Sequence, residues 1–138
     1  MEKPKEEATL EIVLKPIGII RSTIADRDMA PRQGSESAVS GKLIVDEHYR
    51  DALFGLEKGS KIVIVYWMHL AERDILQVHP RGDRTRPVRG VFSTRSPDRP
   101  NPISIDTVEI TGIKGAVIDV IGLDAVDGTP LLDIKCIA

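Results

Sequence analysis

Three closely spaced prolines, Pro97, Pro100 and Pro102, exclude a helix from the segment that contains them. Each proline lacks a backbone N–H and fixes its own φ, and each also disfavours helix in the residue before it. The loop that they form is therefore extended and pre-shaped at a low cost in entropy. The residues that follow, 103–113, alternate between one set at 103, 105, 107, 109 and 111 and another at 104, 106, 108 and 110. This alternation predicts a β-strand.

Other segments of the chain carry similar strand patterns, separated by glycine and proline turns. Pro16 makes the first strand an edge or a bent strand, whereas the continuous apolar run at 61–70 is expected at the centre of a sheet. A short helix is expected over residues 48–56, with Asp46 as its cap. The further predicted strands are residues 11–21, 40–46, 61–70, 90–94, 116–123 and 131–137.

Six or seven short strands with one brief helix indicate a mainly β protein, either a barrel or a sandwich. A chain of 138 residues fits one domain. We therefore expect a disordered tail over residues 1–10, followed by a single small β-barrel-like domain over residues 11–138 with long functional loops. Neither an internal repeat nor a linker is visible.

Several classes of protein are excluded or disfavoured by composition. No apolar run approaches the roughly 18 residues of a membrane span, and the N-terminus lacks the order of a signal peptide. Cys136 is the only cysteine, so no intramolecular disulfide forms and a cytoplasmic location is the default. His48, His69 and His79 lack metal-ligand spacing, and no metal is predicted. A phosphate-cradling glycine loop and a nucleophile elbow are also missing.

The charge of the chain is unevenly distributed. The net charge of the chain is −2. Residues 81–99 hold six arginines against Asp83 and Asp98, which gives this segment a charge of +4 and the rest of the chain a charge of −6. A basic patch on an acidic body suits a defined anionic target, and arginine rather than lysine favours forked contacts. A solvated arginine loop is the alternative. The substrate-binding candidates are Arg81, Arg84, Arg86, Arg89 and Arg99.

Four segments together carry a resemblance to a known family. They are Pro31-Arg32-Gln33, Trp67-Met68-His69, the block Phe-Ser-Thr-Arg-Ser-Pro-Asp-Arg-Pro-Asn-Pro-Ile at 92–103, and Asp-Gly-Thr-Pro-Leu-Leu-Asp-Ile-Lys at 127–135. In this order they resemble the TsaA-like (TrmO-type) family over roughly residues 15–135. The resemblance implies a β-barrel methyltransferase with S-adenosylmethionine as donor, a homodimer, and methylation of the exocyclic amine of threonylcarbamoyl-modified adenosine beside the tRNA anticodon.

The resemblance also implies which residues lie near the cofactor. An arginine would bind its carboxylate, and Asp127 would bind its hydroxyls or its ammonium group. The implied cofactor-binding residues are Pro31, Arg32, Gln33, His69, Leu70, Arg95, Ile105, Asp127, Gly128 and Thr129.

The chain departs from the family pattern at two places. Ser104 follows Asn-Pro-Ile where the family usually has glycine, and Cys136, Ile137 and Ala138 stand where it often has Pro-Tyr. Longer relatives also carry an extra C-terminal domain. We expect these departures to affect tRNA affinity and full catalytic competence more than cofactor binding.

Asn101 is the candidate catalytic residue. An exocyclic adenine amine is a poor nucleophile, so a site must accept hydrogen bonds from it as the new bond forms. Rossmann-type adenine methyltransferases use an Asn-Pro segment in this way, and Asn101-Pro102 matches it by analogy between unrelated folds. The alternative is a turn residue that binds its own backbone. Two other function classes also stay open: a non-catalytic S-adenosylmethionine-binding module, and a nucleic-acid-binding barrel without cofactor.

Overall fold

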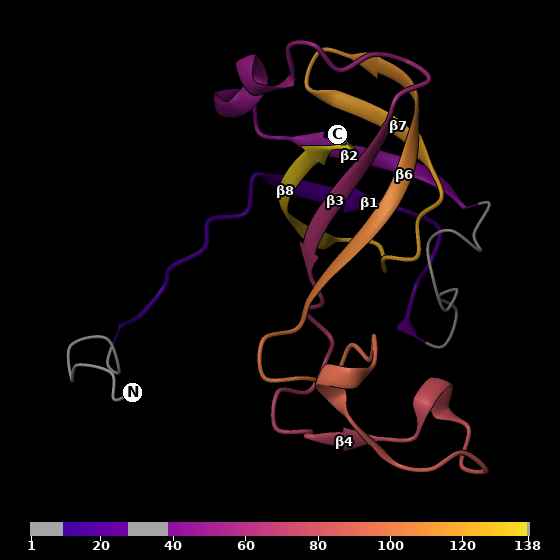
Figure 1. The fold of residues 1–138 in the computed structure, drawn as a ribbon. Helices are drawn as coiled ribbons and strands as arrows, with labels where there is room; N and C mark the ends of the chain where they lie inside the picture. Colours follow the sequence, from indigo (N-terminus) through magenta and orange to yellow (C-terminus); the bar gives the residue numbers. More distant parts are fainter. Residues whose placement is uncertain (1–9, 28–38, 138) are drawn as a thin grey trace.

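The computed structural model describes residues 10–27 and 39–137, and its centre is a closed antiparallel barrel (Figure 1). Neighbouring strands around the barrel follow the order β1-β2-β7-β6-β3-β8. Closure gives each strand two neighbours along at least part of its length, so that no whole strand lies at a free edge as the outer strands of a sandwich do. The predicted mainly β domain is confirmed, as a barrel. Its strands are Gly18–Arg21 (β1), Ser40–Val45 (β2), Lys61–Trp67 (β3), Ile103–Lys114 (β6), Val117–Ile121 (β7) and Thr129–Cys136 (β8).

The barrel interior is filled by alternate side chains of these strands. On β6, Val108 and Ile110 are buried, while the intervening Thr107 and Glu109 are exposed, so the predicted alternation is confirmed. The inward set also includes Asp106, a carboxyl group in an otherwise apolar interior. The remaining core comes from all six strands and the β7–β8 connection, with Ile20, Leu43, Val45, Ile62, Ile64, Tyr66, Ile118, Val120, Leu123 and Leu131 among its members.

Two predicted strands are wrong, one in where it begins and one in its type. The first strand is not residues 11–21, because pairing with both neighbours begins only at Gly18. Pro16, which has no N–H to donate, lies at the break. The strand expected at 90–94 is a 3-10 turn over Val91–Ser93 (η5), preceded by the two-residue strand Arg89–Gly90 (β5).

Two other elements differ in detail from their predictions. The central strand ends at Trp67 rather than at residue 70, and a turn follows it. The short helix is a 3-10 helix over Glu47–Leu53 (η3). Asp46 caps it as predicted, accepting a hydrogen bond of 2.9 Å from the His48 N–H.

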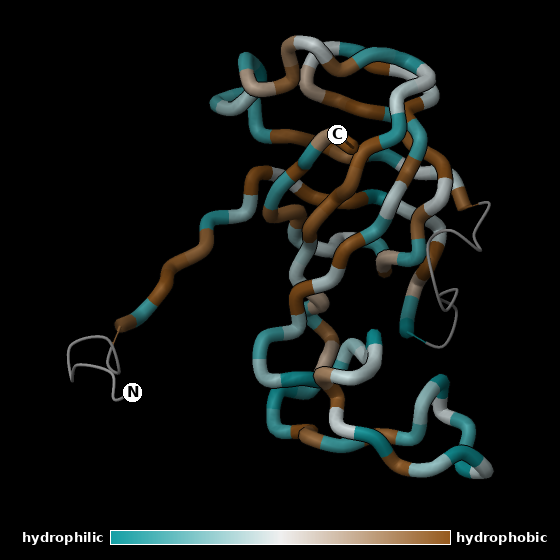
Figure 2. The backbone as a smooth tube through the Cα atoms, viewed as in Figure 1, coloured by the Kyte–Doolittle hydropathy of each residue, from teal (hydrophilic) through white to brown (hydrophobic). Residues whose placement is uncertain are grey.

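A lobe of irregular chain, residues 68–102, leaves the barrel between β3 and β6 (Figure 1). It contains the two-stranded pair of β4 (Gln77–Val78) with β5, a 3-10 turn over Pro80–Gly82 (η4), and η5. The lobe is largely hydrophilic (Figure 2), and all of residues 81–90 are exposed. Hydrogen bonds therefore maintain its shape more than apolar packing does.

No helix among residues 10–27 and 39–137 is long and apolar enough to cross a membrane.

Candidate functional site

The functional loops gather at one end of the barrel because the strands are antiparallel. Trp67, the last residue of β3, pairs with Ile103, the first of β6. On the neighbouring strands, Ile20 near the end of β1 pairs with Thr129, the first residue of β8. The segments that follow or precede these residues must therefore leave the barrel together. We call them the loop junction: residues 21–27, 68–73, 94–102 and 124–129.

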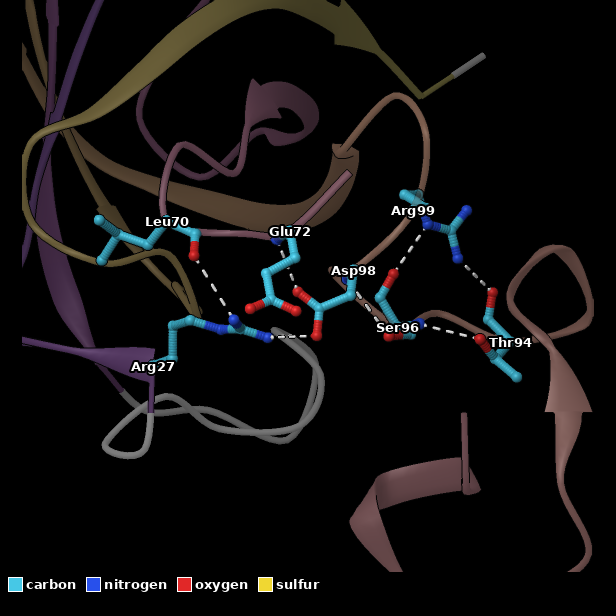
Figure 3. A network of polar contacts seen from close by, with 7 residues as sticks. All are labelled: Arg27, Leu70, Glu72, Thr94, Ser96, Asp98 and Arg99. Carbon is cyan, nitrogen blue, oxygen red and sulfur yellow. Dashed lines mark hydrogen bonds and ion pairs between the residues drawn. The ribbon is translucent and has the colours of Figure 1, made fainter. Parts of the chain in front are cut away.

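Arg99 fixes the shape of the proline-rich loop. Its Nε donates to the carbonyl of Ser96 at 2.7 Å, and its Nη2 donates to that of Thr94 at 2.8 Å (Figure 3). The Nη2 also donates to the carbonyl of Val91 at 2.9 Å. Hydrogen bonds from a charged donor are shorter and stronger than neutral ones. Arg99 was predicted to bind substrate. In the structure, its guanidinium donates hydrogen bonds to carbonyl groups of the same segment.

Asp98 ties the proline-rich loop to two other segments (Figure 3). Its Oδ1 accepts a hydrogen bond of 2.9 Å from the Glu72 N–H, and its Oδ2 forms an ion pair of 3.0 Å with Arg27. Arg27 also donates to the carbonyl of Leu70 at 3.4 Å. A single carboxylate therefore holds the loop, the turn after β3 and the segment after β1 in contact.

The segment after β1 also contacts the turn that carries Asp127. The Ser22 N–H donates to Asp127 Oδ1 at 3.0 Å, and the Asp127 N–H donates to the Ile24 carbonyl at 2.8 Å. Arg21 adds an exposed ion pair with Asp127 at 3.5 Å. Gly128 has a φ of 84°, which glycine adopts without a side-chain clash. Residues 21–27 thus join the two segments whose motifs are the most distinctive in the sequence.

Asn101 is oriented by Arg73, a residue that the sequence did not single out. The Arg73 guanidinium donates from Nε to the Pro100 carbonyl at 2.6 Å and from Nη2 to Asn101 Oδ1 at 3.1 Å. It also lies over the Trp67 ring, 5.1 Å from the centroid, a cation–π geometry. The Asn101 oxygen retains a second lone pair that can accept a further hydrogen bond.

A buried polar cluster beneath the loop junction consists of Tyr66, Asp106 and Asp124. The Tyr66 hydroxyl lies 2.5 Å from Asp124 Oδ1 and 3.1 Å from Asp106 Oδ2. The Asp124 N–H donates to Asp106 Oδ2 at 3.3 Å. The cluster therefore attaches the start of the Asp127 turn to the barrel interior.

The buried position of this cluster favours the neutral forms of Asp106 and Tyr66. Burial, followed by the nearby Asp124, raises the pKa of Asp106 from its usual 3.8 to about 9. Burial also raises the pKa of Tyr66 well above its usual value, with the two carboxyl groups adding to the effect. The Tyr66 hydroxyl is the donor toward both carboxyl groups, and protonation of Asp106 removes one of the two negative charges beside it. The sequence did carry one sign of this cluster, because Asp106 lies on the same face of its strand as the apolar Val108 and Ile110.

The structure places the predicted cofactor-binding residues as follows. His69, Leu70, Arg95 and Asp127 are exposed at the loop junction. Among the described residues, Arg95 forms no hydrogen bond or ion pair.

The other predicted cofactor-binding residues lie on the strands or outside the described residues. Ile105 faces outward on β6 and is 46% exposed. Thr129 is buried, and its hydroxyl donates to the Val126 carbonyl at 2.5 Å, so that its side chain closes the turn. Pro31, Arg32 and Gln33 lie outside the described residues, which break off after Arg27 at the loop junction.

The four other substrate-binding candidates, Arg81, Arg84, Arg86 and Arg89, are exposed on the lobe. Arg81 has a φ of 55°, a left-handed conformation that a non-glycine residue seldom adopts. Among the described residues, no group of histidine, cysteine, aspartate or glutamate could hold a metal ion.

The fold and the loop junction define a class of protein: a small β-barrel domain whose candidate site is built from loops at one end of the barrel. Comparison with known proteins specifies the class further. The chain belongs to the tRNA-methyltransferase O N-terminal domain family, whose model matches residues 19–137.

Two archaeal relatives match most of the chain. A probable S-adenosyl-L-methionine-binding protein of Methanothermobacter thermautotrophicus is 47% identical over 126 residues, covering 91% of this chain and 90% of that protein. An S-adenosyl-L-methionine-binding protein of Archaeoglobus fulgidus is 43% identical over 124 residues, covering 90% of this chain and 88% of that protein.

The crystal structure of TrmO from Pseudomonas aeruginosa matches the fold with a TM-score of 0.76 at 30% identity. The match covers 94% of this chain and 57% of the solved chain, so this protein spans little more than half of that one. The family assignment and the barrel predicted from the sequence are confirmed.

Proposed function

We propose that this protein is an S-adenosylmethionine-dependent methyltransferase that acts on the exocyclic amine of threonylcarbamoyl-modified adenosine beside the tRNA anticodon. The observation that carries the proposal is the loop junction, at which residues 21–27 connect the proline-rich loop to the Asp127 turn. The methyltransferase family and the relatives named as S-adenosyl-L-methionine-binding support it. We further propose that the protein acts as a homodimer and in the cytoplasm.

The residues of the loop junction fit the chemistry of S-adenosylmethionine. The exposed guanidinium of Arg95 can pair with the carboxylate of the cofactor. Exposed apolar surface at Leu70 and Ile105 suits the adenine ring. When bound, the cofactor supplies a methyl group on a sulfonium, which transfers by in-line displacement and requires accurate positioning.

Asn101 would act on the amine that receives the methyl group. Its Oδ1 is oriented by Arg73 at 3.1 Å, and its free lone pair is available to the amine proton. Such an acceptor localises the amine lone pair as the bond to carbon forms. Arg73 is a positioning residue in this scheme.

The direct test is incubation of the protein with labelled S-adenosylmethionine and unfractionated tRNA, followed by nucleoside analysis. The proposal expects label in methylated threonylcarbamoyladenosine. Label in another nucleoside would overturn the substrate assignment. Without label in tRNA, an increase of melting temperature with cofactor concentration would leave a cofactor-binding module. No increase would indicate a nucleic-acid-binding barrel.

Arg95→Ala should weaken S-adenosylmethionine binding and leave the fold intact, because this exposed side chain takes no part in core packing. Loss of one hydrogen-bonded charge contact corresponds to roughly a tenfold or larger increase in Kd. Calorimetry of wild type and variant measures the change. Arg50→Ala, which removes an exposed arginine from η3, is the matched control. Unchanged affinity in Arg95→Ala would remove Arg95 from the site.

The arginines of the lobe should make tRNA binding steeply dependent on salt. The arginines tested are those at 81, 84, 86 and 89. If they contact phosphates, neutralising one of them should make the slope of log K against log salt shallower by roughly one unit. Filter binding over a salt series measures the slope. Lys114→Ala, an exposed cation at the end of β6, is the control. A slope unchanged by any of the four arginine replacements would reduce the segment to a solvated loop.

A further inference from the structure

The segment before β1 has the pattern of a strand but has no strand partner. We call residues 10–15 the arm. Leu10, Ile12 and Leu14 alternate with Glu11, Val13 and Lys15, which is strand periodicity. Ile12 and Val13 are 78% and 81% exposed, and Leu10 is 71% exposed. The arm leads away from the barrel (Figure 1), and much of its length is apolar (Figure 2).

The barrel offers a matching edge on β8. Pairing between β1 and β8 covers Thr129 to Leu131 only, and one further hydrogen bond joins the Ile17 N–H to the Leu131 carbonyl at 2.7 Å. β8 nevertheless continues to Cys136, paired with β3 alone among the described strands. We call residues 132–136 the β8 edge. Within it, the Ile134 N–H donates to the adjacent Asp133 carboxylate at 2.9 Å.

The arm and the β8 edge are similar in length, and the same sheet register would align them. β1 and β8 pair Gly18 with Leu131 and Ile20 with Thr129, and this register, continued, sets Val13 opposite Cys136. The arm is not paired with the edge of its own barrel, and it leads away from the barrel instead (Figure 1). A segment with strand periodicity that leaves its barrel can pair with the same edge of a second copy.

We infer that the arm of one copy adds as a strand to the β8 edge of a second copy, and that the exchange is reciprocal. The inference rests on the proposed homodimer and names the segment that links its two copies. Strand addition would pair the open backbone groups of β8 and bury the alternating apolar side chains of the arm. A reciprocal exchange is closed, so it yields a dimer rather than a fibre.

Disulfide trapping tests the contact directly with the single native cysteine, Cys136, which is exposed. Val13→Cys should give a covalent dimer on mild oxidation, since opposed residues of paired strands bring their Cβ atoms within disulfide range. Glu11→Cys and Lys15→Cys cover a register shifted by two residues. Wild type and the Val13→Cys, Cys136→Ser double variant are the controls and should not give this product.

The outcomes separate the exchange from the dimer itself. A chain that sediments as a monomer would overturn both proposals. A dimer in which none of the three cysteine variants is trapped would overturn the exchange alone. An intramolecular disulfide in any variant would show that the arm closes on its own barrel, and would also overturn it.

A second measurement does not depend on cysteine geometry. Ile12→Asp places a charge on the apolar face of the arm, and it should raise the dimer dissociation constant at least about tenfold. Glu11→Ser, on the other face of the arm, is the matched control and should leave the constant nearly unchanged. Equal constants for wild type and Ile12→Asp by sedimentation equilibrium would contradict the exchange.

Discussion

Asn101→Ala should lower the single-turnover rate of methyl transfer about a hundredfold or more, which is typical of losing one preorganised contact to a transition state. Cofactor affinity should change little, because Asn101 is expected to contact the target amine. The fold should also persist, since Asn101 is exposed and its amide oxygen accepts a hydrogen bond from the Arg73 guanidinium, which is itself exposed. Rapid-quench measurement with saturating cofactor and tRNA gives the rate.

Asn101→Asp distinguishes an acceptor from a turn residue. The aspartate keeps an acceptor beside Arg73 but loses the donor and gains a charge. If only the acceptor matters, the aspartate variant should be faster than the alanine variant. A turn residue would behave differently, because both variants would melt at lower temperature while the rate per folded molecule stayed constant. Full activity in Asn101→Ala would refute the catalytic assignment.

Asp106→Asn should make the stability of the barrel less dependent on pH. The folded protein holds the pKa of Asp106 at about 9, well above its usual 3.8. The neutral carboxyl contributes fully to the stability of the folded state at any pH below the pKa of Asp106 in the unfolded chain. This contribution declines as pH rises, and it is lost once pH passes the pKa of Asp106 in the folded protein. Between these limits the unfolded chain binds fewer protons than the folded chain, so stability falls by up to about 1.4 kcal/mol per pH unit.

The measurement is the free energy of unfolding in urea from about pH 5 to pH 8, for wild type and Asp106→Asn. The variant should gain stability relative to wild type as pH rises, by roughly 1 kcal/mol per pH unit. The titratable groups facing Asp106 are Tyr66 from β3 and Asp124 from the β7–β8 connection, and both remain in the variant. Asp119→Asn, a surface carboxyl paired with Lys42, is the control. A difference independent of pH would show that Asp106 is ionised in the folded state.

The sequence by itself determined the class of fold and the positions of its chemistry-bearing segments. Alternation at 103–113 and the apolar run beginning at 61 depend on neighbours one or two residues apart, so they can be read without tertiary information. Proline has the same local character, since it restricts its own φ and the residue before it. The distinctive blocks at 92–103 and 127–135 identified the family for the same reason, because order along the chain is sufficient to match them.

Only the tertiary structure decided how these segments meet. Closure into a barrel, rather than a sandwich, depends on β1 pairing with both β2 and β8. The roles of Arg27 and Arg73 depend on partners that are distant in sequence, such as Asp98 and Asn101. The raised pKa of Asp106 depends on burial beside Tyr66 and Asp124, which lie on other elements. Contacts of this kind have no local periodicity, because antiparallel folding brings together residues that the sequence keeps far apart.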